Sequence, residues 1–195
     1  MEKECYLIGD PVIQSPSASI MNAAFSESNL PYTYKLLRIP KKEINIYATF
    51  FLRKKNVRFF NITVPHKNTF VEYLDEVDRS VINTGAVSCV INNEGRLIGY
   101  NTDLHGFSKA LATHNISLRG EHADVIGAGG AAGAIVHSLI QQGADVTILN
   151  RTPEKAKTLA SKFNCTYNSL SNAGASKRKL LVNTTPVGMF PNIHE

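Results

Sequence analysis

One lysine and one aspartate near the ends of predicted strands are the residues best suited to chemistry in this chain. Lys67 closes the segment 61–67, where a strand ends and a helix is expected to begin. An ammonium in the first turn of a helix is electrostatically unfavourable, and such a site suits a lysine that exchanges protons. Asp103 follows another strand end and offers a carboxylate that would favour the charged lysine. The pair predicts proton transfer; a solvated Lys67 and an Asp103 that caps a helix are the alternatives.

A glycine-rich stretch in the second half of the chain predicts a nucleotide-binding turn. A strand, the pattern G-x-G-x-x-A and a helix rich in small residues follow one another over residues 124–140. Gly127 would make the tight turn, Gly129 would let the backbone approach a pyrophosphate, and Ala132 would let the helix pack closely on the strand. This order predicts dinucleotide binding. The loop that would hold the phosphates comprises Gly127, Ala128, Gly129, Gly130 and Ala131.

The end of the next predicted strand indicates which dinucleotide binds. A carboxylate there would grip a free ribose 2′-hydroxyl, but the strand ends in Asn150, Arg151 and Thr152. A guanidinium binds a 2′-phosphate through two parallel hydrogen bonds, and Lys155 adds a second cation. Thr152 also suits the N-cap of the following helix, a role that is compatible with a cofactor contact. We therefore expect NADP in preference to NAD.

The elements that must position these residues alternate between strand and helix, which is typical of an α/β fold. In the first half we expect strands at 6–8, 32–39 and 57–64, helices at 17–29 and 41–55, and a hairpin of 86–91 with 96–100. A helix over 104–114 then leads to four strands, near residues 123, 146, 166 and 181. The helix after the glycine turn is expected to stop at Gly143, and the next one to start at Pro153. We place the boundary between two domains near Asp103.

Composition limits what else the chain can be. It has 195 residues, 43% of them hydrophobic and 19% charged, which suits a globular protein with its own core. Its three cysteines are isolated and its six histidines lack ligand spacing, so we expect neither a disulfide framework nor a metal site. Without a signal-peptide pattern or a membrane-length apolar run, we expect a cytoplasmic protein with no membrane contact. The net charge of +5 is concentrated between residues 35 and 67 and favours an anionic substrate or cofactor over nucleic acid.

A set of motifs in a fixed order spans essentially the whole chain. It comprises Gly9-x-Pro11 with Ser15-x-Ser17, residues 61–67 (NITVPHK), 85–87 (GAV), 99–103 (GYNTD), 127–132 (GAGGAA), 150–152 (NRT) and 183–189 (NTTPVGM). In this order the set resembles the shikimate dehydrogenase family. The resemblance implies an N-terminal α/β substrate domain over residues 1–103, followed by a Rossmann-type NADP-binding domain over residues 104–195. It further implies a cytoplasmic monomer or homodimer that reversibly reduces 3-dehydroshikimate to shikimate with NADPH, in the pathway to chorismate and the aromatic amino acids.

The resemblance also implies roles for individual residues. Ser15 and Ser17 would bind the substrate carboxylate, and Thr63 would hydrogen-bond the substrate. Lys67 would give a proton to the developing alkoxide, while Asp103 maintains the charge and position of that lysine. The glycine loop and the segment from Asn150 to Lys155 would hold NADP. No metal is required, because the lysine serves as the acid.

Two departures from the family pattern leave alternatives open. Ser88 stands where the pattern has an asparagine that contacts substrate, and a hydroxyl lacks the reach of an amide. A quinate or shikimate-like dehydrogenase with altered ring specificity is therefore one alternative. The family pattern also continues beyond residues 183–189, and we count four strands where a doubly wound sheet has six. We expect a nucleotide domain that is incomplete at its C-terminus, with an exposed sheet edge and apolar face. A truncated, non-catalytic remnant that binds nucleotide is the other alternative.

Overall fold

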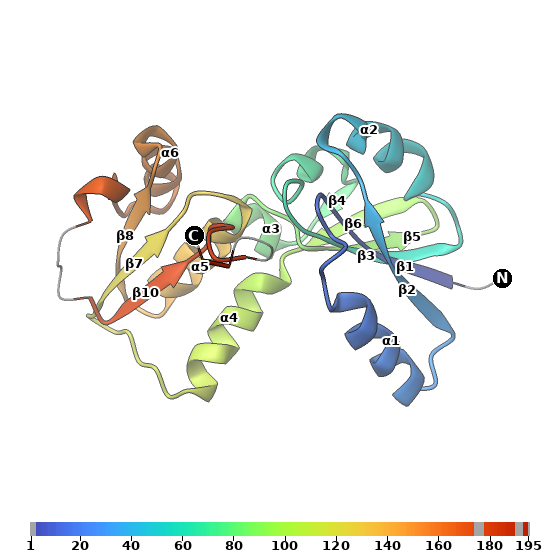
Figure 1. Cartoon of the computed structure of the whole chain (residues 1–195), viewed down its shortest axis with the longest axis horizontal. Helices are drawn as coiled ribbons and strands as arrows, with labels where there is room; N and C mark the ends of the chain where they lie inside the picture. The colour runs from blue at the N-terminus through green and yellow to red at the C-terminus, as the bar shows by residue number, and fades with distance from the viewer. Residues whose placement is uncertain (1–2, 174–177, 190–192, 195) are drawn as a thin grey trace. The chain divides into compact units, whose positions relative to one another are not determined.

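The structure, a computed structural model, describes residues 3–173, 178–189 and 193–194. The chain divides into two compact units, Met1–Asn101 and Thr102–Glu195. Each unit contains its own sheet and its own helices (Figure 1), so the predicted α/β fold is confirmed. No helix in the described part of the chain is long and apolar enough to cross a membrane.

The first unit is built on a six-stranded mixed sheet in the order β2-β1-β3-β5-β6-β4. The strands are β1 (Lys3–Gly9), β2 (Tyr32–Arg38), β3 (Val57–Ile62), β4 (Glu76–Val77), β5 (Cys89–Asn93) and β6 (Arg96–Tyr100). Strand β1 pairs in parallel with β2 and β3, whereas β5 pairs antiparallel with β3 and β6. The predicted hairpin is β5–β6. Its two-residue turn, Glu94 and Gly95, has positive φ at both positions, as a type I′ turn requires.

Strand β1 contributes to a core on each face of this sheet, because successive side chains of a strand point to opposite faces. On one face, Cys5 of β1 packs in a core with Phe25 of α1 (Ser17–Glu27). On the other face, Tyr6 and Ile8 of β1 join a larger core that includes Phe60. The segments that contribute to this second core are α2 (Ile44–Ile46), η2 (Tyr47–Phe51), η3 (Thr69–Tyr73) and α3 (Arg79–Thr84).

The predicted helix over residues 41–55 is shorter and less regular than expected. It consists of a 3-10 turn η1 (Lys41–Glu43), the short α2 and the π-helical η2, and it ends at Phe51. Beyond that point the side-chain amide of Asn92 donates to the carbonyl oxygens of Leu52 (2.8 Å) and Lys54 (3.0 Å). These carbonyls therefore bind the β5–β6 hairpin instead of a further helical turn. The prediction is wrong at this end because local periodicity does not reveal a contact across 40 residues.

The second unit carries a parallel sheet in the order β10-β7-β8-β9. Its strands are β7 (His122–Ile126), β8 (Asp145–Asn150), β9 (Thr166–Ser169) and β10 (Leu180–Asn183), and its helices are α4 (Thr102–Thr113), α5 (Gly130–Gln141) and α6 (Pro153–Phe163). Val125 of β7, Ile148 of β8 and Leu139 of α5 belong to one core, together with residues of α4 and α6. Helix α5 ends before Gly143, whose φ of 81° confirms the predicted stop.

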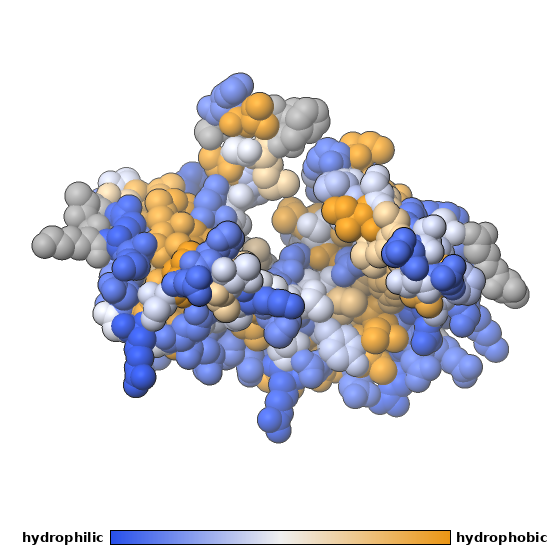
Figure 2. All heavy atoms as spheres, turned by 90° about the horizontal axis from the view of Figure 1, so that it is seen from below, coloured by the Kyte–Doolittle hydropathy of each residue, from blue (hydrophilic) through white to orange (hydrophobic). Residues whose placement is uncertain are grey.

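Strand β10 lies at one end of the described strand order of this sheet. Among the described strands it pairs with β7 alone. Leu181 of β10 is 48% exposed. On the face drawn in Figure 2, apolar side chains reach the surface in several places between hydrophilic ones.

The ion pair between Arg53 and Asp75 predicts a pH-dependent contribution to stability. Arg53 Nη1 donates to Asp75 Oδ2 at 2.5 Å, and the backbone N–H of Leu97 donates to the same oxygen at 2.7 Å. The hydrogen bond from Arg53, followed by that from Leu97, lowers the pKa of Asp75. Because this pKa is lower in the folded than in the unfolded chain, the stabilisation is present above the unfolded pKa. It is lost as the pH falls through the folded pKa.

We therefore expect Asp75→Asn to lower the free energy of unfolding at neutral pH by about 1 kcal/mol or less, because solvent screens an exposed pair. The carboxylate side chain is 39% exposed. Urea unfolding should show the difference from wild type shrinking towards about pH 3, below the usual Asp pKa. Glu76→Gln is the control, since Glu76 and its partner Arg96 are 54% and 61% exposed. A difference that stays constant across this pH range would contradict the prediction.

Candidate active site

The loop after β1 brings two predicted binding residues into contact. Ser15 Oγ donates to Ser17 Oγ at 2.9 Å, and the backbone N–H of Ser17 donates to Ser15 Oγ at 3.2 Å. Both serines are partly buried, and Ser17 is the first residue of α1. Two adjacent hydroxyls that can rotate to donate or accept suit an oxygen-rich group such as a carboxylate.

Thr63 lies against the point where this loop leaves β1. An ideal Cβ on Gly9 would lie 2.4 Å from Thr63 Cγ2 and 2.7 Å from the carbonyl oxygen of Val64. Only a residue without a Cβ therefore lets the two strand ends approach this closely. Strand β3 ends at Ile62, two residues before the predicted end, yet the N–H of Thr63 still donates to Ile8 of β1. This hydrogen bond holds the backbone of Thr63 at the end of β1.

Lys67 lies in the turn that follows Thr63 and is partly buried. The prediction that Lys67 lies in the first turn of a helix is wrong, because η3 begins at Thr69 with Asn68 as its N-cap. The argument from the helix dipole therefore does not apply to Lys67. Instead, the carbonyl oxygen of Lys67 accepts a hydrogen bond from the N–H of Val87 at 2.8 Å. The backbone of the lysine is thus joined to the segment that carries Ser88.

Ser88 is 4% exposed and lies beside a partly buried polar pair that sequence reasoning misses. Asn61 Nδ2 donates to the carbonyl oxygen of Ser88 at 3.2 Å, and the hydroxyl of Tyr34 donates to Asn61 Oδ1 at 2.8 Å. Burial raises the pKa of Tyr34, so its hydroxyl stays protonated as a donor. Asn61 lies inside a quoted motif, but nothing in the sequence signals that Tyr34, 27 residues earlier, is its partner.

Asp103 belongs to the second unit. Helix α4 begins at Thr102, so Asp103 lies in its first turn and is not its N-cap. The alternative interpretation of Asp103 as a capping residue is therefore wrong. A carboxylate in the first turn of a helix lies at the positive end of the helix dipole, a position that acidic residues favour.

The predicted glycine loop joins β7 to α5. It is packed against other residues at Gly127 and open at Gly129. Gly127 has a φ of 110°, and an ideal Cβ there would lie 2.5 Å from Thr184 Oγ1. Thr184 donates to the carbonyl oxygen of Ile126 through both its N–H (2.8 Å) and its Oγ1 (2.7 Å), so the segment after β10 packs against the loop. Gly129 is the N-cap of α5, and an ideal Cβ there meets nothing within 4 Å. This open turn at the amino end of a 12-residue helix fits a pyrophosphate.

The residues predicted to select the ribose phosphate lie at the end of β8 and the start of α6. Arg151, Thr152 and Lys155 are exposed, and Asn150 is partly buried. Thr152 is the N-cap of α6 and Pro153 follows it, but the threonine side chain makes no capping hydrogen bond, contrary to the prediction. Asn150 Nδ2 instead donates to the carbonyl oxygen of Thr152 at 2.8 Å, which closes this turn. An exposed guanidinium with a nearby lysine fits a 2′-phosphate.

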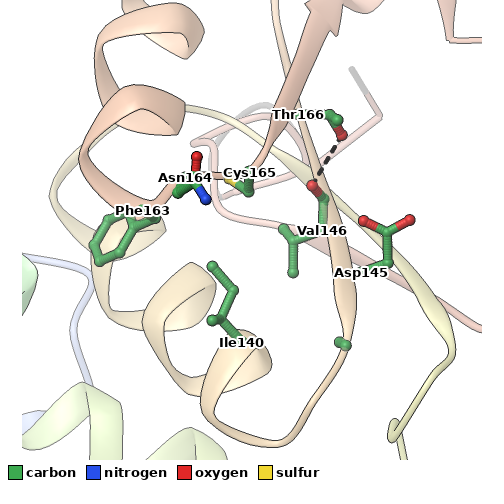
Figure 3. Close-up of a pocket in the computed structure, with 8 residues that line it drawn as sticks. Ile140, Asp145, Val146, Phe163, Asn164, Cys165 and Thr166 are labelled. Atoms are coloured by element: carbon green, nitrogen blue, oxygen red, sulfur yellow. Dashed lines mark hydrogen bonds between the residues drawn. The ribbon is translucent and has the colours of Figure 1, made fainter.

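A cavity of about 340 Å³ lies at the opposite end of the same sheet (Figure 3). Its lining residues are Ile140, Ala144, Asp145, Val146, Phe163, Asn164, Cys165 and Thr166, none of which is a predicted site residue. Asp145 and Thr166 begin β8 and β9, whereas the glycine loop follows the end of β7. Burial raises the pKa of Cys165 to about 11, so its thiol stays protonated and is a poor nucleophile. The cavity is therefore not part of the predicted site.

Histidines and cysteines supply no metal ligands in the described part of the chain, where no group of three or more His, Cys, Asp or Glu is placed to hold an ion. Cys5, Cys89 and Cys165 are free thiols. His66, next to Lys67, is fully buried, and its Nε2 lies 2.7 Å from the carbonyl oxygen of Ile39. We therefore interpret His66 as a structural residue of this turn.

Two family models match consecutive parts of the chain. The model described as shikimate dehydrogenase substrate binding domain matches residues 7–90, and the model described as shikimate / quinate 5-dehydrogenase matches residues 110–180. The two matches fall in the first and the second unit, respectively.

Individual relatives agree with these matches. A curated shikimate dehydrogenase (NADP(+)) from Nitrosopumilus maritimus is 40% identical over 197 residues, which covers 97% of this chain and 72% of that protein. The shikimate 5-dehydrogenase from Thermus thermophilus, solved in complex with NADP(H) and shikimate, is similar with a TM-score of 0.85 and 35% identity over 95% of this chain and 69% of that one. The shikimate 5-dehydrogenase from Listeria monocytogenes, solved in complex with shikimate and NAD, is similar with a TM-score of 0.83 and 28% identity. The match covers 99% of this chain and 72% of that one.

The open side of the glycine turn predicts different effects for two alanine substitutions. Gly129→Ala adds a Cβ that meets no protein atom, so we expect wild-type stability but at least a roughly tenfold weaker affinity for NADP, because the backbone must approach the pyrophosphate. Gly127→Ala places its Cβ against Thr184 at a positive φ, so we expect it to lose about 1–3 kcal/mol of stability as well. Thermal unfolding and calorimetric titration with NADP measure both effects. Tight NADP binding by Gly129→Ala would show that the phosphates lie elsewhere.

Proposed function

The chain belongs to the shikimate dehydrogenase family, and we propose that it catalyses the NADP-dependent, reversible reduction of 3-dehydroshikimate to shikimate. The reaction lies on the route to chorismate and the aromatic amino acids. One observation carries the proposal: the 40% identity to an NADP-dependent shikimate dehydrogenase extends over 97% of the chain. It thus includes both the strand ends of the first unit and the glycine turn of the second.

The second unit supplies the residues that would hold NADP. The backbone from Gly127 to Ala131 binds the pyrophosphate, since Gly129 keeps the turn open and no side chain caps α5. Asn150, Arg151, Thr152 and Lys155 hold the adenosine ribose with its 2′-phosphate, because a carboxylate, which would repel that phosphate, is absent from this strand end. NADPH, when bound, supplies the hydride that reduces the ketone carbon.

The first unit supplies the residues that would bind the substrate. The Ser15–Ser17 pair donates hydrogen bonds to the substrate carboxylate, and the Thr63 hydroxyl bonds a ring oxygen. Ser88, held by Asn61 through its carbonyl oxygen, lines the same set of strand ends. These groups orient a ring that is rich in hydroxyls and carries one negative charge. Orientation of this kind converts binding energy into rate.

Lys67 and Asp103 form the proposed catalytic pair. As the ketone carbon accepts hydride, negative charge develops on its oxygen, and the Lys67 ammonium stabilises this charge and donates a proton to the oxygen. In the reverse direction the neutral amine of Lys67 takes the hydroxyl proton while hydride leaves the carbon. The Asp103 carboxylate favours the ammonium form and orients it.

Ser88 supports a second candidate, a quinate or shikimate-like dehydrogenase. Its side chain is short and buried where the family pattern has an asparagine, so the ring has fewer polar contacts at this point. Purified protein assayed with shikimate and with quinate, each with NADP or NAD, separates the candidates. Turnover of shikimate with NADP supports the main proposal, and preferred turnover of quinate supports the second. Binding of NADP without turnover of either would indicate a non-catalytic nucleotide-binding protein.

We also propose that the chain acts in the cytoplasm as a monomer or homodimer without a nucleic-acid partner. The basic excess between residues 35 and 67 is partly neutralised by ion pairs. Lys35 pairs with Glu4, Arg38 with Asp10 and Arg53 with Asp75. These pairs leave a weaker positive field than the sequence alone implies.

The role of Lys67 predicts a loss of turnover rather than of affinity. We expect Lys67→Ala to lower kcat roughly 10²- to 10⁴-fold, the range for loss of a general acid, and to change the KM for shikimate much less. Steady-state kinetics in both directions test this. Lys55→Ala, which removes an exposed lysine before β3, is the matched control. Near-normal turnover by Lys67→Ala would refute the assignment.

The role of Arg151 predicts a change in cofactor preference. We expect Arg151→Gln to weaken NADP binding by roughly 1.5–3 kcal/mol, the usual loss for a hydrogen bond to a charged group, and to leave NAD binding nearly unchanged. Kinetics with the two cofactors measure the ratio. Arg119→Gln is the control, because Arg119 packs against Gly143, which precedes the start of β8, whereas Arg151 follows the end of β8. An equal loss for NADP and NAD would contradict a phosphate contact.

A further inference from the structure

We propose that Asn101 is a positioning residue, which holds the backbone of Lys67 and Ser88 in place for the reaction proposed above, on which this inference rests. Asn101 is the last residue of the first unit and lies between β6 and α4. Although it is an amide, it is only 3% exposed. Two residues further along the chain is Asp103.

The hydrogen bonds of Asn101 converge on one short segment. Its Nδ2 donates to Thr84 Oγ1 at 3.0 Å and to the carbonyl oxygen of Ala86 at 2.8 Å. Its backbone N–H donates to Ser80 Oγ at 2.8 Å, which joins it to α3 as well. Thr84 is 2% exposed, so these bonds form away from solvent. The side-chain amide of Asn101 therefore binds Thr84, the last residue of α3, and Ala86 within segment 84–88.

Segment 84–88 contains Ser88 and is hydrogen-bonded to the backbone of Lys67. The N–H of Val87 donates to the carbonyl oxygen of Lys67 at 2.8 Å, and the N–H of Ser88 donates to the carbonyl oxygen of Tyr100 at 2.9 Å. Asn68, which follows Lys67, donates through Nδ2 to the carbonyl oxygen of Gly85 at 3.0 Å. Movement of this segment would thus move Lys67 and Ser88 together.

An asparagine is the side chain that suits this position. Both acceptors, a hydroxyl and a carbonyl oxygen, require donors, and one amide nitrogen supplies two. Alanine at this position removes both donors, and aspartate replaces them with acceptors. A buried polar group without its partner is unfavourable, so the segment would shift to find another. A displacement of about 1 Å at a catalytic group is enough to lower the rate roughly 100-fold.

The experiment compares Asn101→Ala with Asn92→Ala in the full chain. Asn92 is a matched control because it is equally buried at 3%, lies in the same unit and donates through Nδ2 to two carbonyl oxygens, but those belong to Leu52 and Lys54. We expect both variants to unfold at lower urea concentration. Only Asn101→Ala should lower kcat, by roughly 10- to 100-fold, and shift the pH profile of kcat, because the lysine that transfers the proton has moved.

Amide hydrogen exchange of Val87 and Ser88 provides a readout that does not depend on activity. We expect faster exchange in Asn101→Ala and unchanged exchange in Asn92→Ala. If Asn101→Ala does not fold, Thr84→Val, which keeps the volume and removes one acceptor, should give the same pattern with a smaller loss. A kcat and pH profile like those of wild type, or an equal loss of kcat in both asparagine variants, would overturn the inference. An inactive wild-type chain would instead refute the proposed function, and hydrogen exchange would then still decide whether Asn101 holds the segment.

Discussion

Close backbone approach at a glycine recurs at the end of the first strand of each unit. Gly9 ends β1 and faces Thr63, which follows β3, while Gly127 follows β7 and faces Thr184, which follows β10. In each unit the two strands are parallel neighbours, so their carboxyl ends meet at one edge of the sheet. Neither glycine has room for a Cβ. The absence of two side chains thus lets functional loops from neighbouring strands lie together.

Hydrogen bonds of the backbone then fix those loops. Thr63 remains bonded to β1 after its own strand has ended, and Lys67 is joined to the segment of Val87 and Ser88. In the second unit Thr184 makes two hydrogen bonds to Ile126 directly before the glycine turn. Such bonds let a loop carry reactive side chains without the mobility that loops usually have. In each unit, backbone hydrogen bonds thus join the loops that carry the proposed site residues to the sheet.

Much of this arrangement is predictable from local sequence patterns. The glycine turn, the stop at Gly143 and the β5–β6 hairpin depend on backbone conformations that few residues adopt, so nearby residues suffice to indicate them. The motif order predicts which strand ends carry the site. Local patterns also place Thr152 correctly at an N-cap but wrongly assign its side chain a capping bond.

The rest depends on contacts between residues that are far apart in sequence. The helix that begins at Lys41 ends early because Asn92 binds the carbonyls that follow it. Tyr34 is hydrogen-bonded to Asn61, and Asn101 to Thr84 and Ala86. Each contact depends on single polar atoms, which leave no periodic pattern in the sequence. A buried amide is stable only where acceptors are placed to receive its hydrogen bonds. That geometry exists only in the folded chain.

The burial of the three thiols has a practical consequence for spectroscopy. The pKa of Cys5 and of Cys165 is raised to about 11, and that of Cys89 is raised as well, in each case chiefly by burial. At about pH 8 roughly one molecule in a thousand carries a thiolate at Cys5 or Cys165, and the thiolate is the form that reacts with maleimides and iodoacetamides. Cys5 and Cys165 are thus expected to react slowly with such reagents at this pH. A cysteine introduced on an exposed face, with an ordinary thiol pKa, would take a fluorophore or spin label faster than Cys5 and Cys165.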